Sequence, residues 1–359
     1  MMKKKKVVHS SIIGNAHRIL RFLERNGKLI SPLLILTHDY PDPDALASAF
    51  ALHHLANTRF GFDSRIAYGG IIGRVENRAM VRILQIPVHK LGARDLKAYA
   101  HIATVDTQPA FANNSFPKGC RAALVIDQHL SEISPDARLS IIDTQCGATS
   151  VIMAQCLLQT GRNVPARLAT ALVYGILSDT QDFYRCHHPD VLQTYLRILE
   201  YADLKMLAQI QNPSQTREFF TTLQQGIHNA MVRRGLVVSC LGVVKNPDLV
   251  SLVSDFLLTY RGTSWSFCLG RYKEKLYFSL RGANANFQAA DVLRDICEDR
   301  GQAGGHDTIA GGSVKVEGSS GDLDWEAAEK GLIDRLGKRL RIPLKSRFYR
   351  PFRWIEKSK

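Results

Sequence analysis

Short apolar segments alternate with amphipathic ones through the first part of the chain, and this pattern limits the folds that it can adopt. The apolar segments have the length of strands and lie at 33–37, 65–69, 101–107 and 122–127. Helical periodicity follows from near Asp44, Glu76, Ala148 and Ala166. Strands that alternate with helices are typical of a parallel sheet. We therefore predict an N-terminal α/β domain built on a parallel sheet at 31–187.

The pattern restarts after a polar, Pro-containing helical segment at 188–230, which we interpret as a connector. Beyond it β-like and helical segments are mixed, and they lie at 234–244, 248–260, 264–272, 275–282 and 287–301. We predict a smaller α/β domain at 231–342, with a cleft between the two domains. Residues 1–30 are interpreted as an N-terminal extension and residues 343–359 as a basic, aromatic tail.

The chain is basic, with a formal net charge of +14. A positive surface concentrates phosphates, so the charge favours a polyanionic ligand, although solubility explains it equally well. Seven cysteines without a C-x-x-C pair favour reduced thiols over a disulfide framework or a structural zinc. No apolar run approaches the ~18 residues of a membrane helix. We therefore expect a cytoplasmic protein without membrane contact.

The segment THDYPDPDALASA places a histidine and two acids between an expected strand and an expected helix. His38, Asp42 and Asp44 would then lie at the carboxyl edge of a parallel sheet, where such sheets bind ligands. Alternate residues in an extended loop point the same way, so Asp42 and Asp44 can reach two neighbouring cations. Taken alone, Asp-Pro-Asp is more often turn chemistry.

Further acids share this placement at the end of an apolar segment. Asp106 ends HIATVDT, Asp127 and His129 end AALVIDQH, and Asp179 lies in ALVYGILSDT. Because an unpaired acid is costly to bury, each needs a counter-charge or a polar edge. Their order along one α/β domain favours a shared metal-binding crevice over separate helix caps or turns.

In these motifs the chain resembles the DHH phosphoesterase superfamily over roughly 31–183. The matching motifs are His38-x-x-x-Asp42-x-Asp44, Asp106 in VDT, Asp127-Gln128-His129 in place of Asp-His-His, and Asp179 in GILSDT.

The resemblance implies two divalent cations, usually manganese, that share Asp106 as a ligand. His38 and Asp42 would hold the first cation. Asp44 and Asp179 would hold the second, together with the first histidine of the family motif. Hard oxygen ligands with imidazole suit manganese or magnesium better than zinc.

Gln128 departs from the family pattern, because the family has a metal-binding histidine at this position. A glutamine carbonyl is a neutral dipole and a poorer ligand for manganese than imidazole. The second cation would then bind more weakly, or a water would replace the ligand, or the protein would bind its substrate without hydrolysing it. Because the other ligand positions are intact, we expect activity to be retained.

The resemblance also implies a mechanism, in which a hydroxide activated by the cations attacks the phosphorus in line. Asp127 would orient His129, which would lie near the scissile phosphate or the leaving oxygen as a hydrogen-bond donor or acid. The alternative is that His129 only fills the crevice wall.

The segment GQAGGHDTIAGGSV is glycine-rich and is expected to be a loop between a helix and a strand. Glycines let backbone N–H groups approach an anion, although a tight turn is the commoner explanation of a bare Gly-Gly-His. The segment also resembles the DHH-associated domain, which implies that this loop and an arginine grip the substrate. The residues concerned are Gly304, Gly305, His306, Gly311, Gly312 and, as the arginine, Arg281. Pairing with a surface acid is the alternative for Arg281.

The end of the chain is rich in lysine and arginine, with Phe348, Tyr349, Phe352 and Trp354 interleaved. This composition suits contact with single-stranded nucleic acid. A tail that packs its aromatic side chains on the domain explains it equally well.

We therefore expect a hydrolase, a metal-dependent phosphoesterase that acts on short oligonucleotides or small phosphorylated nucleotides. It is similar to NrnA-like enzymes, which degrade very short RNA and dephosphorylate phosphoadenosine phosphate. The alternatives are a soluble cyclic-dinucleotide phosphodiesterase, a RecJ-like single-strand exonuclease, and a non-catalytic nucleotide or nucleic-acid binder. The sequence leaves the exact substrate, the metal and assembly as a homodimer open.

Overall fold

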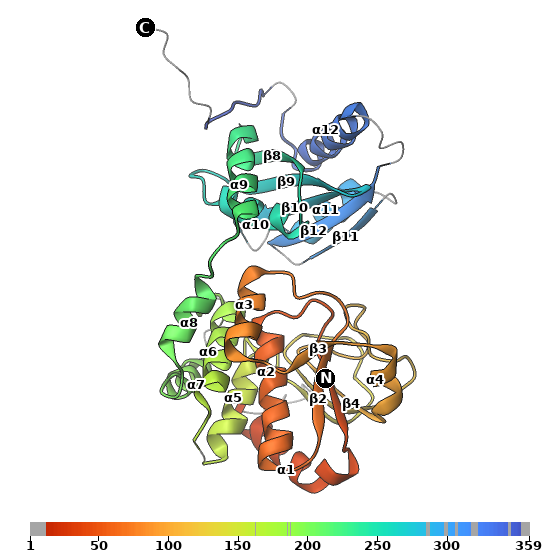
Figure 1. Cartoon of the computed structure of the whole chain (residues 1–359), viewed down its shortest axis with the longest axis vertical. Coiled ribbons are helices and arrows are strands. Elements are labelled where there is room, and N and C mark those ends of the chain that lie inside the picture. Colours follow the sequence, from red (N-terminus) through yellow and green to blue (C-terminus); the bar gives the residue numbers. More distant parts are fainter. Residues whose placement is uncertain are drawn as a thin grey trace, which may run out of the picture. The chain divides into compact units, whose positions relative to one another are not determined.

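The computed structural model describes residues 12–161, 163–184, 186, 188–284, 288–297, 301–305, 308–316, 322–343 and 346–352. The chain divides into two compact units, Met1–Pro213 and Ser214–Lys359. Figure 1 shows the elements of both units, and each unit has its own sheet and its own helices.

The first unit is built on a six-stranded parallel sheet in the order β3-β2-β1-β4-β5-β6. Its strands are β1 Leu33–Leu36, β2 Ser64–Tyr68, β3 Val88–Lys90, β4 His101–Val105, β5 Ala122–Asp127 and β6 Ala137–Ile142. From β1 the chain moves outward to β3, and from β4 it moves outward in the other direction to β6. The neighbours β1 and β4 therefore mark the switch point, where open α/β sheets bind ligands at the carboxyl ends of their strands.

Helices and loops cover both faces of this sheet. The helices are α1 Ile12–Asn26, α2 Pro43–His54, α3 Val75–Leu84, α4 Ala93–Ala98, α5 Thr149–Gln159, α6 Ala166–Thr180, α7 Pro189–Leu199 and α8 Leu204–Gln211, with short turns η1 Gly27–Leu29 and η2 Leu55–Arg59. Alternate residues of β1 serve opposite faces: Leu33 and Ile35 join the large core with the helices, and Leu34 and Leu36 join a smaller cluster on the other face. Burial on both faces explains why β1 is apolar throughout.

The predicted parallel sheet and the four predicted helix starts are confirmed. The two edge strands, β3 and β6, were not predicted, because they are short and only partly buried. Residues 1–30 were predicted to be an extension, whereas α1 packs into the first core through Ile12, Ala16, Ile19 and Leu23.

The segment expected as a connector, 188–230, is helical but is divided between the two units. Helices α7 and α8 bury Val191, Ile198 and Ile210 in the core of the first unit. The boundary falls at Pro213, and α9 Arg217–Asn229 belongs to the second unit.

The second unit has a mixed six-stranded sheet in the order β11-β12-β10-β9-β8-β7. Its strands are β7 Met231–Arg233, β8 Leu236–Val243, β9 Trp265–Tyr272, β10 Lys275–Gly282, β11 Gly301–Gly305 and β12 Ile309–Lys315. Only β8 and β9 are paired in parallel among these described strands.

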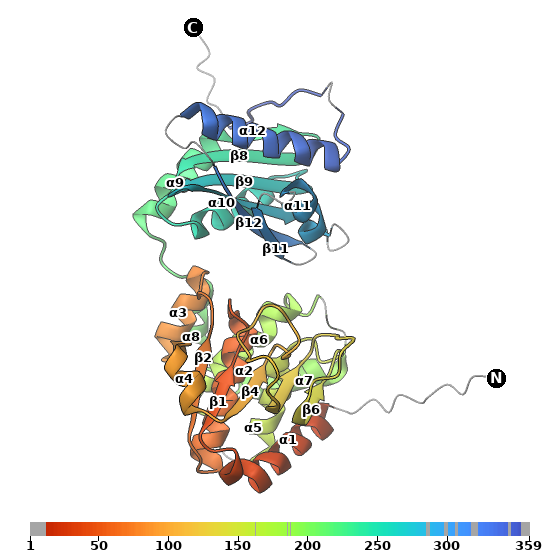
Figure 2. The ribbon, with the colours of Figure 1, turned by 90° about the vertical axis from the view of Figure 1, so that its right-hand side faces the viewer.

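Two apolar clusters flank the sheet. One includes residues of α11 Ala289–Cys297 and α12 Asp322–Arg339, and the other includes residues of α9 and α10 Asp248–Leu258. Figure 2 shows α12 running beside the strands.

The glycine-rich segment expected as a loop forms two strands instead. Gly304 pairs with Gly311, and Ala303 pairs with Gly312, across the antiparallel pair β11 and β12. Glycine is a poor strand former, so its abundance concealed these strands in the sequence. Ladder pairing with β10 supplies the stabilisation that the side chains lack.

The described part of the C-terminal tail packs on the second unit. Tyr349 exchanges two backbone hydrogen bonds with Val232, at 2.8 Å and 3.0 Å, and so extends the edge of the sheet at β7. The guanidinium of Arg233 lies 4.3 Å from the centre of the Phe348 ring, and Phe352 makes an edge contact with Tyr260. These contacts favour the packed tail over a free arm, and Trp354 lies outside the described residues.

No helix in the described part of the chain is both long and apolar enough to cross a membrane.

Candidate metal and phosphate site

The loop after β1 and the start of α2 bring the first histidine and acid together. Asp42 is the N-cap of α2, and its Oδ1 accepts a hydrogen bond from the Ala45 N–H at 3.0 Å. Pro43 occupies the first turn, where its missing N–H costs nothing. His38 Nε2 lies 3.8 Å from Asp42 Oδ1. Asp-Pro-Asp therefore does form the start of a helix, as a turn sequence would. The same local structure places the Asp42 carboxylate near His38.

The loop after β2 supports this segment closely. The N–H groups of Gly70 and Ile71 donate to the carbonyl oxygen of Asp39 at 2.8 Å and 3.0 Å. A Cβ at Gly70 would lie 2.2 Å from that same carbonyl oxygen. The backbone beside His38 thus depends on a glycine in the neighbouring loop.

Asp106 follows β4, the neighbour of β1, and joins the same cluster. Its backbone has a positive φ of 57°, and its side chain is almost fully buried. Its Oδ2 lies 3.8 Å from His38 Nε2, and its Oδ1 accepts from the Thr149 hydroxyl at 2.9 Å. The ligand atoms of His38, Asp42 and Asp106 all lie within 4.8 Å of one another.

Asp44 is fully buried and is bound to the N-terminus of α5. Its Oδ2 accepts from the Thr149 N–H at 2.7 Å, and its Oδ1 accepts from the Ser150 N–H at 2.6 Å. The positive end of a helix dipole stabilises a carboxylate in this position. Asp44 was expected to face the same crevice as Asp42, and backbone amides bind both of its oxygens.

Asp179 and Gln128 lie beside Asp44. Asp179 is placed in the last turn of the helix α6, not at the end of a strand. The Gln128 Nε2 donates to Asp179 Oδ2, and it lies 3.4 Å from Asp44 Oδ2. The structure thus brings together the three residues expected at the second cation, with the Gln128 amide nitrogen facing the two carboxylates.

Asp127 and His129 form a hydrogen-bonded pair at the end of β5. Asp127 Oδ1 binds His129 Nδ1 at 2.8 Å, while Asp127 Oδ2 accepts from Gln108 Nε2 at 2.7 Å. Gln108 also donates to the carbonyl oxygen of His129 at 2.8 Å. Sequence reasoning missed Gln108, because nothing in VDTQ except its position two residues after Asp106 marks it.

Crowded acids perturb the protonation of this cluster. Burial, and then the charges of Asp179 and Asp42, raise the pKa of Asp44 to about 8. Burial and the charge of Asp44 raise the pKa of Asp106 well above its usual range. Burial also acts to raise the pKa of Asp42, but the neighbouring His38 outweighs it and lowers that pKa to about 2. Such an excess of buried negative charge is typical of a cation site.

The hydrogen bond that His129 Nδ1 donates to Asp127 Oδ1 raises the pKa of His129 to about 9. The His129 side chain is 47% exposed, and Nδ1 is the ring nitrogen bound to Asp127. Nε2 is therefore the nitrogen that can meet a ligand, and in the metal-free protein the raised pKa favours the protonated ring.

The arginine proposed for substrate binding in the second unit is mostly occupied by protein groups. Arg281 is buried, its Nε pairs with Asp255, and its Nη1 donates to the carbonyl oxygens of Leu280 and Ala310 at 3.1 Å and 3.2 Å. These contacts favour the alternative, in which Arg281 pairs with an acid of its own domain. His306 lies outside the described residues.

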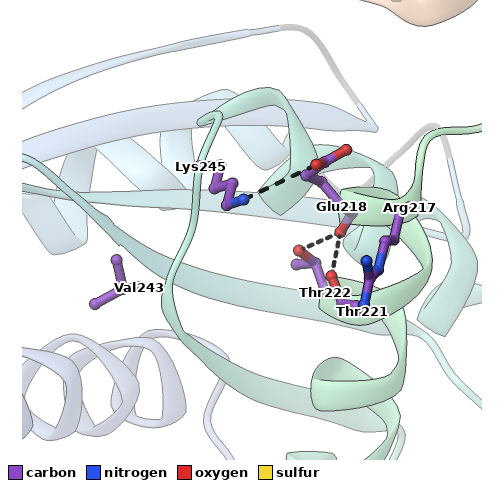
Figure 3. Close-up of a pocket in the computed structure, with 6 residues that line it drawn as sticks. All are labelled: Arg217, Glu218, Thr221, Thr222, Val243 and Lys245. Atoms are coloured by element: carbon purple, nitrogen blue, oxygen red, sulfur yellow. Dashed lines mark hydrogen bonds and ion pairs between the residues drawn. The ribbon is translucent and has the colours of Figure 1, made fainter.

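Figure 3 is a close-up of a pocket in the second unit. The pocket has a volume of about 470 Å³, and none of the expected site residues is among the residues that line it. It is lined by Arg217, Glu218, Thr221, Thr222, Val243 and Lys245. Lys245 Nζ lies 3.9 Å from Glu218, and Lys245 is 81% exposed. The Thr221 and Thr222 hydroxyls donate to the backbone carbonyl of Glu218. The polar groups of this pocket are thus exposed to solvent or hydrogen-bonded within α9. The pocket therefore lacks the buried polar side chains that orient a ligand in a specific binding site.

Comparisons with known proteins identify the family of the chain. A family model described as the DHH family, N-terminal domain, matches residues 32–176. The uncharacterized protein MJ1633 of Methanocaldococcus jannaschii is 31% identical over 331 residues, which cover 92% of this chain and 68% of that protein.

Solved structures include one with clearly the same fold. An exopolyphosphatase-related protein from Bacteroides fragilis matches with a TM-score of 0.70 at 15% identity, covering 94% of this chain and 99% of that chain. RecJ from Thermus thermophilus, solved in complex with Mg²⁺, gives a TM-score of 0.44 at 14% identity, covering 93% of this chain and 53% of that chain. With the family model and the relative in M. jannaschii, the ordered motifs lead to one conclusion: the chain belongs to the DHH superfamily of phosphoesterases.

Proposed function

We propose that this phosphoesterase hydrolyses short oligonucleotides or small phosphorylated nucleotides with the help of divalent cations, of which manganese is the expected one. One observation carries the proposal: two sets of ligand atoms meet at Asp106. His38, Asp42 and Asp106 form one set, and Asp106, Asp127 and His129 form the other, each within 4.8 Å. A cation-binding group and a proton-donating group thus share one edge of the sheet.

The residues of the first set fit a hard divalent cation. They offer two carboxylates, which are ligands that manganese and magnesium prefer, together with one imidazole. The 3.8 Å separations of His38 Nε2 from both acids are too long for hydrogen bonds and suit two ligand atoms that share an ion. A cation held there would neutralise phosphate charge and lower the pKa of a water.

Asp127 and His129 would move the proton that hydrolysis requires. Asp127 holds the Nδ1 edge of the ring, and the protonated ring then presents Nε2–H to a leaving oxygen. Gln108 holds Asp127 in turn, so the orientation of His129 is set by two successive hydrogen bonds.

The glycine pair in the second unit supports a role in gripping substrate phosphate. No described atom lies within 4 Å of a Cβ added at Gly304, and at Gly311 only a carbonyl oxygen lies at 3.7 Å. Packing therefore does not require glycine at these two positions. Their lack of side chains leaves bare backbone that an anion can approach.

The test is a substrate panel on the full chain with Mn²⁺ or Mg²⁺. The panel holds dinucleotides, phosphoadenosine phosphate, cyclic dinucleotides and longer single strands. We expect metal-dependent turnover of the short substrates, abolished by Asp42→Asn and retained by Asp136→Asn, an exposed acid paired with Arg121. Absence of turnover for every substrate and both metals would overturn the proposal. Preference for cyclic dinucleotides or long strands would select one of the alternative phosphodiesterases.

A non-catalytic nucleotide binder is the second candidate, and Gln128 is the observation that favours it. Tight binding of a dinucleotide without turnover, measured by calorimetry on the same samples, would select the binder.

A cytoplasmic location is a further proposal, supported by seven cysteines that are all free thiols.

A further inference from the structure

We propose that the side-chain amide of Gln128 takes the place of the second cation, so that the protein at rest holds one divalent cation, at His38, Asp42 and Asp106. This inference rests on the proposed metal-dependent function. It concerns the one position at which this chain departs from the family motif.

The orientation of the amide is the first observation. Gln128 Nε2 donates to Asp179 Oδ2 and lies within hydrogen-bonding distance of Asp44 Oδ2, at 3.4 Å. An amide nitrogen is a donor and cannot bind a cation. Each carboxylate that would hold the second ion therefore faces a group that satisfies it. A cation could enter only if both contacts broke and the amide turned its oxygen inward.

The saturation of Asp44 is the second observation. A carboxylate has about four acceptor sites. On Asp44, Oδ1 accepts from the Ser150 N–H at 2.6 Å and from the Ser48 hydroxyl at 3.4 Å. Oδ2 accepts from the Thr149 N–H at 2.7 Å and faces Gln128 at 3.4 Å. The four sites are thus used, and a second cation would have to displace one of these donors.

The first set of ligands differs in this respect. His38 Nε2 is 3.8 Å from both Asp42 and Asp106, so these groups are close without bonding to each other. Asp42 accepts a hydrogen bond from the Ala45 N–H through Oδ1, and Asp106 accepts one from the Thr149 hydroxyl through Oδ1. A cation here joins groups that have acceptor capacity to spare, so the two sites should differ strongly in affinity.

The experiment titrates Mn²⁺ into the metal-free full chain by calorimetry and follows the bound ions by electron paramagnetic resonance, without any substrate. We expect one tight Mn²⁺ per chain and a second at least about tenfold weaker, because hydrogen bonds to carboxylates must break. Gln128→His should bind two ions and give the signal of a coupled pair. Gln209→His, on the exposed side of α8, adds the same imidazole elsewhere and should bind one.

The variant Gln128→Ala distinguishes two roles of the amide: one in which it occupies the place of the second cation, and one in which its oxygen is a ligand of that cation. It removes the donor, so we expect the second Mn²⁺ to bind more tightly than in the wild type. Weaker binding of the second ion in Gln128→Ala would mean that the amide oxygen is a ligand, and would overturn the inference. Two ions of similar affinity in the wild type would also overturn it and leave the proposed function standing. No Mn²⁺ binding at all would count against the proposed function itself. Thermal melts of each variant confirm that the chain is folded.

Discussion

Replacement of Gln108 tests the roles of Asp127 and His129 most directly. Gln108 is fully buried, and its Nε2 donates to Asp127 Oδ2 at 2.7 Å and to the His129 carbonyl at 2.8 Å. Gln108→Met keeps the length of the side chain and removes both donated hydrogen bonds. The substitution therefore loosens the support of His129 without touching an expected metal ligand.

The size of the effect follows from these contacts. Asp127 has no exposed surface, so its Oδ2 would stay buried without this donor. A hydrogen bond to a charged group contributes about 1.5–3 kcal/mol and an ordinary one about 1 kcal/mol, so the free energy of unfolding should fall by about 2–4 kcal/mol. A well-placed proton donor contributes at least about 100-fold to the rate, so its partial misplacement should lower kcat about 10- to 100-fold. KM should change little, because Gln108 is buried and does not meet the substrate.

The assay is a double-mutant cycle of Gln108→Met and His129→Ala. Hydrolysis of the best dinucleotide, whose leaving alkoxide needs a proton, gives kcat and KM, and urea unfolding gives stability. If Gln108 acts through His129, Gln108→Met lowers kcat in the wild-type background and has almost no further effect when His129 is absent. Gln209→Met on the exposed side of α8 is the matched control.

Equal losses of kcat in both backgrounds would refute the reasoning, because Gln108 would then support the fold and not His129. An unchanged kcat in Gln108→Met, with stability reduced as expected, would refute it too. In that case the hydrogen bonds would be structural, and His129 would need no second support.

Three further predictions concern other parts of the chain. Asp106→Asn should lower metal-dependent hydrolysis by more than about 100-fold, which exceeds the loss expected for a residue that only supports a metal ligand. Thermal melts of the metal-free variant should show no loss of stability, because burial and acidic neighbours already disfavour the charge of Asp106. In metal-free protein Asp127 raises the pKa of His129 to about 9. The protonated ring therefore stabilises the fold fully below a pH of about 6.5, and this contribution is lost as the pH rises through about 9. The free energy of unfolding, measured in urea at both ends of this range, should depend on pH, and His129→Gln should reduce that dependence. Phe348→Ala should lower the stability of the second unit by about 1–2 kcal/mol through lost stacking on Arg233, whereas a free nucleic-acid arm would instead show unchanged unfolding and weaker binding of single strands.

The sequence predicts the first unit well where local pattern and chemistry agree. The apolar strands and the Asp-Pro-Asp cap place His38 and Asp42 at the end of β1 without any structural information, because a strand, a turn and a helix start follow each other within a few residues. Asp106 and Asp127 follow by the same logic, since the carboxyl ends of parallel strands share one edge.

Other contacts are set by packing between distant segments, and no local pattern records them. The attachment of Asp44 to the N-terminus of α5 joins residues more than a hundred positions apart. The support of Asp127 by Gln108 depends on the neighbouring positions of β4 and β5 in the sheet. In the second unit, the resemblance to the DHH-associated domain led us to expect Arg281 at the substrate, whereas its Nε pairs with Asp255 and its Nη1 donates to two backbone carbonyls. A charged residue in a sequence indicates that an interaction is present, but the sequence alone does not identify the partner.

The N-terminus of α5 explains how so many acids are held together. Thr149 donates its N–H to Asp44 and its hydroxyl to Asp106, so one residue joins the two carboxylate loops. The helix dipole favours charged acids at this end, while burial and the neighbouring acids oppose the charge and raise the pKa of Asp44 to about 8. Burial and the charge of Asp44 likewise raise the pKa of Asp106, which is the acid of this pair proposed as a cation ligand. Because a cation binds the deprotonated carboxylate, metal binding and release of this proton must be coupled, and the metal affinity must rise as the pH rises through the range in which Asp106 titrates.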